Sequence, residues 1–504
     1  MQQATSRPAV PVRPQRVLFL EINEAERHFL ETYAGQGHLP AFRRALDEGV
    51  LLNTRIPGWD ARKERAWRDI SPWIIWPSVY TGLLPAEHGI VGFGQDTSSL
   101  RERCVWDVLD RQGVSTGIFG CLMSYPPRSH GAAKFYVPEA LADSPECFPE
   151  EARPVQEFSV LAARNYSEGF GWNGVAVLRK LLRSMGAGVS AGTVAKTLLQ
   201  IPAEKLVGAH KEPERAMLAS YIGYEAFKEL YARHQPQYAA LHLNHVAYVQ
   251  HRYWRAAEPN RFAEQLSETD RRFFDRVEQR KRYEQRFADW ILKAFRYTDR
   301  VLGEMMASVP DDTLVLVGTG LGVRPFDPCS EIHNPVVRLV RERELFDAIG
   351  LSGYQVLHQM NPDVTVNFRD EDSAAQALEV LGGLYALDDE GLFAIQRRGK
   401  QLFLELNVPR GGLSGPGAKI RHRQRPGWSV ESRRHIAEHW NNDQSTSHHK
   451  DVGLLLAWCK GRRVTSEHKS IAVTDIAPTI LAQFGIEPQP WHRPEKVPAF
   501  RIEG

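Results

Sequence analysis

Three short runs of apolar residues, widely separated along the chain, constrain its fold more than any other feature. They cover residues 17–22 (VLFLEI), 313–317 (TLVLV) and 453–457 (GLLLA). Runs of this length with few polar positions are typical of strands that are buried on both faces of a sheet. Segments with helical spacing lie between them, at 39–51 and 105–113, and after the last of them, at 475–484. This alternation predicts an α/β fold with a mostly parallel sheet between helices.

The composition is that of an ordinary globular chain and restricts its partners. Of 504 residues, 42% are hydrophobic and 25% are charged, which is enough apolar material for a large core. The 63 Lys and Arg nearly balance the 61 Asp and Glu. Binding to nucleic acid or to a membrane surface needs a marked basic excess, so neither partner is expected. Five scattered cysteines without a C-x-x-C pair, and no apolar stretch in the first 16 residues, predict a cytoplasmic location.

Local composition predicts three kinds of segment. Residues 1–15 are Pro-rich and predict a disordered tail, whereas residues 16–150 and 300–504 carry the strand and helix pattern of a core. Residues 151–299 are charged and helix-forming, which predicts a helical insertion. Such an insertion either shields apolar sheet surface or forms a cap over an active-site cleft.

A Gly-, Arg- and His-rich stretch at 405–450 predicts a long functional loop. Its basic side chains could hold an anionic group by bidentate contacts, and the alternative is a solvated basic loop. The residues concerned are Arg421, His422, Arg423, Arg425, Arg433 and Arg434.

Three groups of motifs, in order along the chain, resemble one protein family. Residues 76–90 (WPSVYTGLLPAEHGI) resemble its P-S-x-x-T-G-x-x-P-x-x-H-G-I segment. Residues 105–109 (VWDVL) and 125–127 (YPP) resemble its W-D-x-L and Y-P-P elements, and residues 474–481 (TDIAPTIL) resemble its D-I-A-P-T-L-L helix. The family is the type I phosphodiesterase/nucleotide pyrophosphatase branch of the alkaline phosphatase superfamily. The resemblance implies an alkaline-phosphatase-like sheet between helices, with the insertion as a cap.

The chemistry that the resemblance implies needs two divalent metals, which clamp the attacking and leaving oxygens, and a Thr or Ser nucleophile beside one of them. In this chain the family's first aspartate falls on Asn23 and the nucleophile falls on Ile75. The Asp-His pair after the later strand falls on Gly318 and Thr319. These groups bind a dication poorly, and an aliphatic side chain cannot attack phosphorus. The alignment therefore predicts a degenerate metal site on the nucleophile side.

The other metal site keeps two histidines. His449 stands in an H-x-x-x-G context before a strand, and residues 244–254 (NHVAYVQHRYW) resemble the family's D-H-x-G-H-x-x-W element. Asn244 and His251 are about two helical turns apart, so they can share one helix face. The candidate metal ligands are therefore Asn244, His251 and His449, which could hold one Zn²⁺, Mn²⁺ or Fe²⁺ weakly. The alternative is a site without metal. The alignment also predicts that His251 and His449 lie close enough to share one ligand.

Four residues are candidates for catalysis, namely Glu21, Asn23, Glu24 and His245. Glu21 and Asn23 share a strand face, and a charge within an apolar strand is costly unless it is paired or functional. Glu21 and Glu24 therefore either form ion pairs at a strand end or supply an acid, base or ligand at the mouth of the sheet. His245 is either an acid–base group or a buried structural histidine.

Three functions remain open at this stage. The first is a divergent phosphodiesterase-like hydrolase or transferase acting on a phosphorylated or sulfated small molecule. The second is a pseudoenzyme with a binding or scaffolding role, and the third is an enzyme of another reaction class that uses Glu and His as acid–base groups. The polar residues of the P-S and H-G-I segments are expected to be structural in each case, namely Ser78, Thr81 and His88.

Overall fold

The structure is a computed structural model of the chain. It describes residues 16–59, 70–90, 92, 95–168, 174–207, 212–260, 285–325, 336–357, 363–386, 391–407, 417–439 and 446–503. The chain divides into two compact units. Unit 1 comprises residues 1–91, 97–326 and 446–504, and unit 2 comprises residues 92–96 and 327–445. The tail expected at residues 1–15 lies outside the described residues. Within those residues, no helix combines the length and the apolar character that a bilayer span requires.

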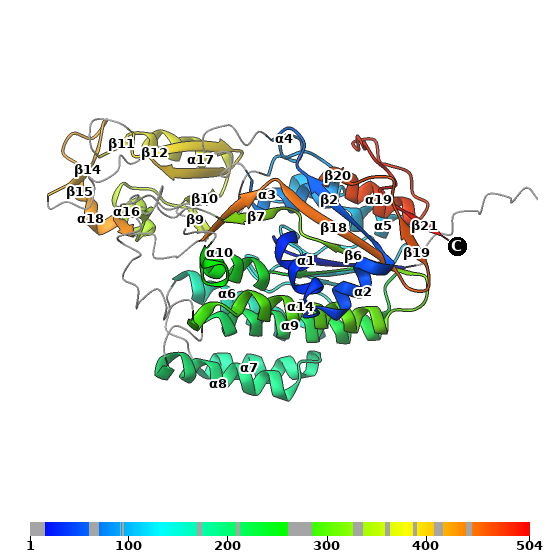
Figure 1. Cartoon of the computed structure of the whole chain (residues 1–504). Helices are drawn as coiled ribbons and strands as arrows, with labels where there is room; N and C mark the ends of the chain where they lie inside the picture. The colour runs from blue at the N-terminus through cyan, green and yellow to red at the C-terminus, as the bar shows by residue number, and fades with distance from the viewer. Residues whose placement is uncertain are drawn as a thin grey trace, which may run out of the picture. The chain divides into compact units, whose positions relative to one another are not determined.

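An eight-stranded sheet forms the centre of unit 1 (Figure 1). Its spatial order is β20 (Ser470–Ala472), β2 (Val50–Arg55), β18 (Val452–Cys459), β6 (Thr313–Gly318), β1 (Arg16–Ile22), β5 (Tyr238–Leu243), β3 (Thr116–Phe119) and β4 (Phe135–Val137). Only β18 is antiparallel to its neighbours in this sheet, so the other seven strands point the same way. The predicted α/β class with a mostly parallel sheet between helices is confirmed.

Strand β1 shows why the sheet is buried on both sides. Val17 and Phe19 pack into one hydrophobic cluster, and Leu18, Leu20 and Ile22 pack into another on the opposite face. Successive side chains of a strand point to opposite faces of the sheet. A strand in which apolar residues do not alternate with polar ones must therefore be covered on both faces.

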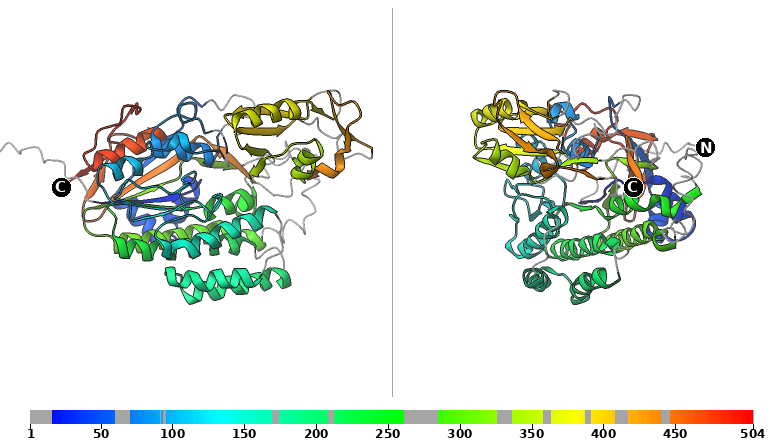
Figure 2. Two further views of the ribbon diagram at one scale, coloured as in Figure 1. Left: turned by 180° about the vertical axis from the view of Figure 1, so that it is seen from behind. Right: turned by 90° about the vertical axis from the view of Figure 1, so that its left-hand side faces the viewer.

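Helices supply the two covers (Figure 2). One face packs against α1 (Arg27–Gly35), α2 (Pro40–Glu48), α9 (Glu212–His234), α10 (His245–Ala257) and α14 (Trp290–Ser308). The other face packs against α3 (Pro72–Thr81), α5 (Val105–Arg111) and α19 (Ile476–Gln483), with the short α4 (Pro85–His88) following α3.

Smaller elements complete unit 1. Three further helices lie on the same side of the sheet as α9, namely α6 (Arg153–Glu168), α7 (Gly174–Ser184) and α8 (Ala191–Val207). Two strand pairs lie outside the main sheet, β7 (Gly322–Pro325) with β17 (Ser447–Lys450), and β19 (Arg463–Thr465) with β21 (Arg501–Glu503). Single 3₁₀ turns are η2 (Ser98–Leu100), η3 (Glu150–Ala152), η4 (Met185–Ala187) and η6 (Val473–Asp475).

Unit 2 has a separate core built on an antiparallel sheet. The strand order is β12 (Phe393–Arg398), β13 (Gln401–Leu406), β10 (Val364–Phe368) and β9 (Tyr354–Leu357). Two smaller sheets follow, β11 (Leu384–Tyr385), β14 (Lys419–His422) and β15 (Ser429–Glu431), and β16 (Ile436–His439) with β8 (Val336–Leu339). The helices are α16 (Glu342–Ala348), α17 (Glu371–Gly382) and α18 (Ser432–His435).

The structure differs from the expected segment boundaries in two places. Residues 151–299 are not helical throughout, because β5 lies inside the main sheet between β1 and β3. The expected loop at 405–450 contains strands β14 to β17, so that prediction was wrong for the described part of the stretch. Ile420 and His422 are buried while their neighbours are exposed, the period-two pattern of a strand, which the many Gly and Arg residues obscured.

Candidate functional site

Polar residues follow three neighbouring strands at one edge of the main sheet. Asn23 follows β1, Asn244 follows β5, and Thr319 follows β6. Because these strands are parallel and in register, their carboxyl ends meet at one edge, where open α/β sheets bind ligands. The Asn23 Nδ2 atom donates a hydrogen bond to Asn244 Oδ1 at 2.7 Å, and Trp76 Nε1 donates to Asn23 Oδ1 at 2.9 Å.

Glu24 is held in an unusual backbone conformation at this edge. Its φ angle is +57°, in the left-handed region that non-glycine residues adopt rarely and that is enriched at functional sites. The Glu24 N–H donates to the Thr319 carbonyl at 3.2 Å. Gln250 Nε2 donates to the Glu24 carbonyl at 2.8 Å, and the Glu26 N–H donates to Gln250 Oε1 at 2.9 Å. The fully buried Gln250 side chain thus fixes residues 24–26 to helix α10.

Glu24 meets two histidines from distant parts of the chain. Its Oε2 lies 2.5 Å from Nε2 of His251 on α10, and its Oε1 lies 3.4 Å from Nε2 of His449 on β17. The two imidazole ring centroids are 5.3 Å apart. One ligand atom from each of the three residues lies within 4.8 Å of the other two. His251 and His449 therefore lie together, as the alignment of their two segments predicted.

Backbone carbonyls orient both imidazoles. Nδ1 of His251 lies 3.1 Å from the Ser447 carbonyl oxygen, and Nδ1 of His449 lies 2.9 Å from the Ile70 carbonyl oxygen. A carbonyl only accepts hydrogen bonds, so a proton on Nδ1 satisfies each of these contacts, and the Ser447 hydroxyl lies 3.0 Å from His251 Nδ1 as a further partner. Each Nε2 is then directed toward Glu24. Metal-binding histidines are typically fixed in this way, with the remote nitrogen bonded to a carbonyl or carboxylate.

The charges of the three residues are coupled. Burial acts against the charged form of Glu24, but His449 and His251 outweigh burial and hold the pKa of Glu24 well below its usual range. Burial also acts to lower the pKa of His251, and the Glu24 carboxylate reverses this effect and raises it. Without a metal, the arrangement is therefore an ion pair between Glu24 and protonated His251.

The donor set suits a single transition-metal ion. Two imidazoles and one carboxylate are a common ligand set for catalytic zinc, and the same set binds non-haem iron with positions left open. Ligands of a tetrahedral zinc site are roughly 3.4 Å apart, given metal–ligand bonds of about 2.1 Å. The Glu24–His449 contact of 3.4 Å matches this spacing, whereas the Glu24–His251 contact of 2.5 Å is shorter, so these two side chains would separate when an ion binds. The three residues fit one ion, and the ion would replace the proton of His251.

The remaining predicted ligand and one predicted catalytic residue lie beside these three. Asn244 is exposed, and its Oδ1 accepts the hydrogen bond from Asn23. Asn23 is buried, and its Nδ2 also lies 3.2 Å from Glu24 Oε1. Two neutral amides therefore stand at the ends of β1 and β5, next to the carboxylate of Glu24.

Glu21 lies on β1 two residues before Asn23, within the sheet, and belongs to a buried polar cluster. Its Oε2 accepts hydrogen bonds from the Tyr80 hydroxyl at 2.7 Å and from His242 Nδ1 at 2.9 Å. Cys121 Sγ lies 3.6 Å from Oε1, and burial raises the pKa of this thiol well above its usual value. Glu21 is thus paired within the sheet layer and is not part of the group formed by Glu24, His251 and His449.

His245 lies among helices and not at the sheet edge. Its Nδ1 is 3.0 Å from Ser220 Oγ on α9, and its Nε2 is 3.0 Å from Thr298 Oγ1 on α14. Burial lowers the pKa of His245 to about 4, so the ring is neutral at physiological pH. The geometry matches the structural alternative for this residue.

The P-S and H-G-I segment is held together by its own polar side chains. Ser78 Oγ and His88 Nε2 are 3.1 Å apart, and Thr81 Oγ1 donates to the Pro77 carbonyl at 2.7 Å. These contacts fit the structural role that the sequence predicts for Ser78, Thr81 and His88. Ile75, at the nucleophile position of the alignment, is fully buried, and the Thr319 hydroxyl accepts a backbone hydrogen bond from Leu454.

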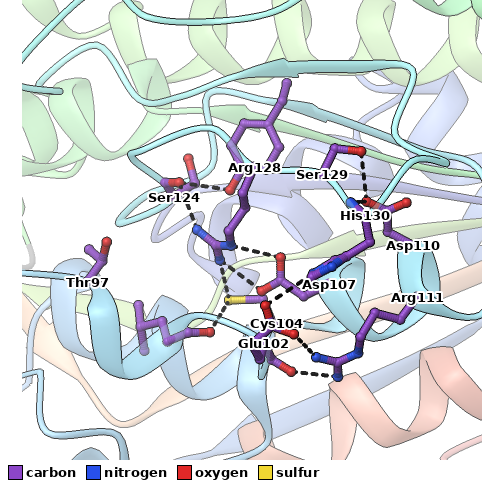
Figure 3. Close-up of polar contacts among 12 residues, drawn as sticks. Thr97, Glu102, Cys104, Asp107, Asp110, Arg111, Ser124, Arg128, Ser129 and His130 are labelled. Atoms are coloured by element: carbon purple, nitrogen blue, oxygen red, sulfur yellow. Dashed lines mark hydrogen bonds and ion pairs between the residues drawn. The ribbon is translucent and has the colours of Figure 1, made fainter.

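The W-D and Y-P-P motifs meet in a buried ion pair (Figure 3). Arg128 donates from Nε and Nη2 to the two carboxylate oxygens of Asp107, at 2.8 and 3.0 Å. Its Nη1 donates to the Ser124 carbonyl at 3.2 Å, while the backbone N–H groups of His130 and Ala132 donate to Asp110. Burial raises the pKa of Asp107, and Arg128 opposes that rise. These motifs fasten the loop at 124–132 to α5.

The six basic residues between 421 and 434 belong to unit 2. Arg434 pairs with Glu344 at 2.9 Å, and Arg425 Nη1 donates to the Ile349 carbonyl at 2.6 Å. These two contacts serve the packing of unit 2 and do not assemble a common anion site.

Two polar residues around the site, His242 and Gln250, were not identified from the sequence. His242 lies on β5, two residues before Asn244, and it pairs in register with Glu21 of β1, so a period-two analysis of β5 would have indicated it. Gln250 gave no signal, because its partners are backbone atoms of residues 24 and 26.

The chain was compared with protein families and with known proteins. A family model described as type I phosphodiesterase / nucleotide pyrophosphatase matches residues 73–378, more than half of the chain. No curated protein matches it.

Three solved structures are among those similar to this chain. A phosphonoacetate hydrolase from Sinorhizobium meliloti is 14% identical over 89% of this chain and 90% of that one, with a TM-score of 0.35. Human ectonucleotide pyrophosphatase / phosphodiesterase 5 is 11% identical over 96% and 99%, with a TM-score of 0.39. The alkaline phosphatase PafA is 15% identical over 98% and 100%, with a TM-score of 0.41.

Proposed function

The chain belongs to the type I phosphodiesterase/nucleotide pyrophosphatase family, and we propose that it is a hydrolase of a phosphorylated small molecule with a single metal centre at Glu24, His251 and His449. The family acts on phosphorylated small-molecule substrates. The observation that carries the proposal is the convergence of one carboxylate and two imidazoles whose Nδ1 atoms are both fixed by backbone carbonyls.

The proposal includes the loss of the second metal and of the side-chain nucleophile. In the alignment, Asn23, Gly318 and Thr319 occupy positions where the family has charged or imidazole ligands, and none of them is a strong ligand for a dication. Ile75 offers no nucleophilic atom. The attacking group is therefore a water molecule, and no covalent intermediate forms on the protein.

Each remaining residue has a distinct task in this proposal. A divalent ion bound by the two histidines and the carboxylate would supply Lewis-acid polarisation of a phosphoryl oxygen. Asn244 is exposed at the sheet edge and donates from Nδ2 to a substrate oxygen. Asn23 holds the Asn244 amide in that orientation through its own hydrogen bond. Gln250 keeps Glu24 in its left-handed conformation.

Hydrolysis of two model substrates tests the proposal. Metal-free protein is assayed with bis(4-nitrophenyl) phosphate and 4-nitrophenyl phosphate, before and after addition of Zn²⁺, Mn²⁺ or Fe²⁺. We expect turnover of at least one ester only with metal. Metal binding should weaken as pH falls, beginning above about pH 6.5, because Glu24 raises the pKa of His251 above the usual imidazole value. Exchange of His449→Ala should weaken metal binding more than about 100-fold, because loss of outer-shell partners alone costs 10–100-fold.

A histidine outside the site provides the matched control. His38 is bonded to Arg296 and not to Glu24, so His38→Ala should leave turnover and metal affinity unchanged. Metal-dependent turnover that survives His449→Ala would contradict the assigned centre. A protein that binds one metal at the triad but hydrolyses neither ester would instead favour the binding-protein alternative.

A further inference from the structure

Exposed apolar side chains concentrate on one helical hairpin of unit 1, formed by α7, η4 and α8. Six large hydrophobic side chains are exposed among the described residues, and only Val452 lies elsewhere. The other five are Leu178 (39% exposed), Leu182 (51%), Met185 (42%), Leu199 (68%) and Leu206 (85%). Scattered surface leucines are normal, but five on one hairpin mark an interaction surface.

These side chains form regular stripes. On the α7 side, Leu178, Leu182 and Met185 follow one another at intervals of four and three residues. On α8, the exposed residues Ala195, Leu199, Pro202 and Leu206 are spaced by four, three and four. Intervals of three and four place residues on one face of a helix. Each helix therefore has an open apolar face besides the face that it packs.

The packed faces identify which side is open. Val177 and Leu181 of α7, and Val194 of α8, are buried in the cluster that covers the sheet. In Figures 1 and 2, α7 and α8 lie side by side as a layer beyond α6 and α9, on the side away from the main sheet. No other described element of unit 1 lies beyond this layer.

The hairpin is also strongly basic. Residues 174–207 contain five Lys and Arg and a single acidic residue, Glu204. Arg179, Arg183 and Lys196 are exposed, whereas Lys180 is paired with Glu157 at 2.6 Å. The expectation of no membrane partner rests on the near-neutral charge of the whole chain. That overall balance hides the local basic excess of the hairpin.

We propose that the α7–α8 hairpin docks unit 1 on an anionic lipid bilayer. Amphipathic helices with leucines on one side and arginines or lysines beside them lie in the interface of a bilayer, with the apolar face at the acyl boundary. The basic residues then contact lipid phosphates, and their long side chains reach the headgroups from the apolar face. This inference is independent of the proposed catalytic function.

A second copy of the chain fits this surface less well. Two hairpins placed face to face would bring Arg179, Arg183 and Lys196 of both copies together, and like charges across an interface oppose association. An anionic bilayer neutralises the same three groups.

Vesicle flotation with the full chain tests the proposal. Phosphatidylcholine vesicles are compared with vesicles of phosphatidylcholine and phosphatidylglycerol, at low and high salt. We expect flotation with the anionic vesicles only, and its loss as salt rises. The double exchange Leu199→Ala/Leu206→Ala should weaken binding at least tenfold, because each buried leucine contributes apolar area. Arg179→Gln/Arg183→Gln should weaken it about 30-fold.

Exposed residues elsewhere supply the controls. Arg43→Gln/Arg44→Gln removes two charges from α2, outside the hairpin, and should leave flotation unchanged. Flotation that is absent, equal with both vesicles, or unaffected by the leucine exchange would overturn the proposal. Light scattering that shows a dimer dissociated by the leucine exchange would also overturn it, since the surface would then bind a second copy.

Discussion

Exchange of Asp107→Asn should destabilise the protein strongly without affecting the metal centre. Asp107 and Arg128 form a bidentate pair in which the side chains are 2% and 13% exposed. Removing one partner of a buried ion pair leaves an uncompensated charge and costs about 3–5 kcal/mol. Arg128 keeps its hydrogen bond to the Ser124 carbonyl, and an asparagine oxygen still accepts one, so we expect the lower end, about 3 kcal/mol.

A solvent-exposed ion pair beside the same helix provides the comparison. Arg111 of α5 pairs with Glu102, and these side chains are 31% and 56% exposed. Exposed pairs contribute about 0–1 kcal/mol, so Glu102→Gln should have little effect.

Urea unfolding of both variants, followed by tryptophan fluorescence, measures the two free-energy changes. Zn²⁺ titration of folded Asp107→Asn protein checks that metal affinity is retained. If Asp107→Asn costs no more than Glu102→Gln, the assignment of the W-D motif to structure is refuted. If metal binding is lost while stability is retained, the motif belongs to the site.

Three further predictions follow from other residues. Because burial lowers the pKa of His245 from 6.5 to about 4, the native state resists protonation of this ring, and the contribution of His245 to the free energy of unfolding should fall by about 3 kcal/mol as pH drops from 6.5 to 4. The exchange His245→Gln should flatten this slope, and an unchanged slope would speak against the buried neutral ring. The exchange Ile75→Thr should not produce strong phosphodiesterase activity, since the neighbouring metal would still lack its ligands; a large gain in turnover would contradict this. The exchange Gln250→Leu should weaken Zn²⁺ binding by roughly tenfold, because Glu24 loses its support, and calorimetry that shows unchanged affinity would exclude this positioning role.

Three strands at the centre of the main sheet were predictable because they are apolar on both faces. β1, β6 and β18 correspond to the three runs with few polar residues, and α5 and α19 follow the helical spacing between caps. β5 (YAALHL) was missed because the strand is short and lies between charged segments with a helical pattern. The separate core of unit 2 was missed because strands such as β14 alternate between buried and exposed residues. The many Gly and Arg residues around them made this period-two pattern hard to recognise in the sequence.

The site was predictable only in part, because its geometry depends on long-range packing. The family resemblance placed His251 and His449 together, although they are 198 positions apart in sequence. It did not place Glu24 with them, since the alignment puts the family's aspartate on Asn23. The left-handed backbone at Glu24, together with the clamp by Gln250, turns its carboxylate toward the histidines, and neither feature leaves a periodic signal in the sequence.

The number of metal ions bound per chain tests the single-metal centre most directly. Metal-free protein is titrated with Zn²⁺ by calorimetry, and the bound metal is confirmed by elemental analysis after gel filtration. The account predicts one ion per chain, with binding lost on Glu24→Gln or His449→Ala and retained on His38→Ala. Two tightly held ions per chain, or one ion that is unaffected by His449→Ala, would contradict it.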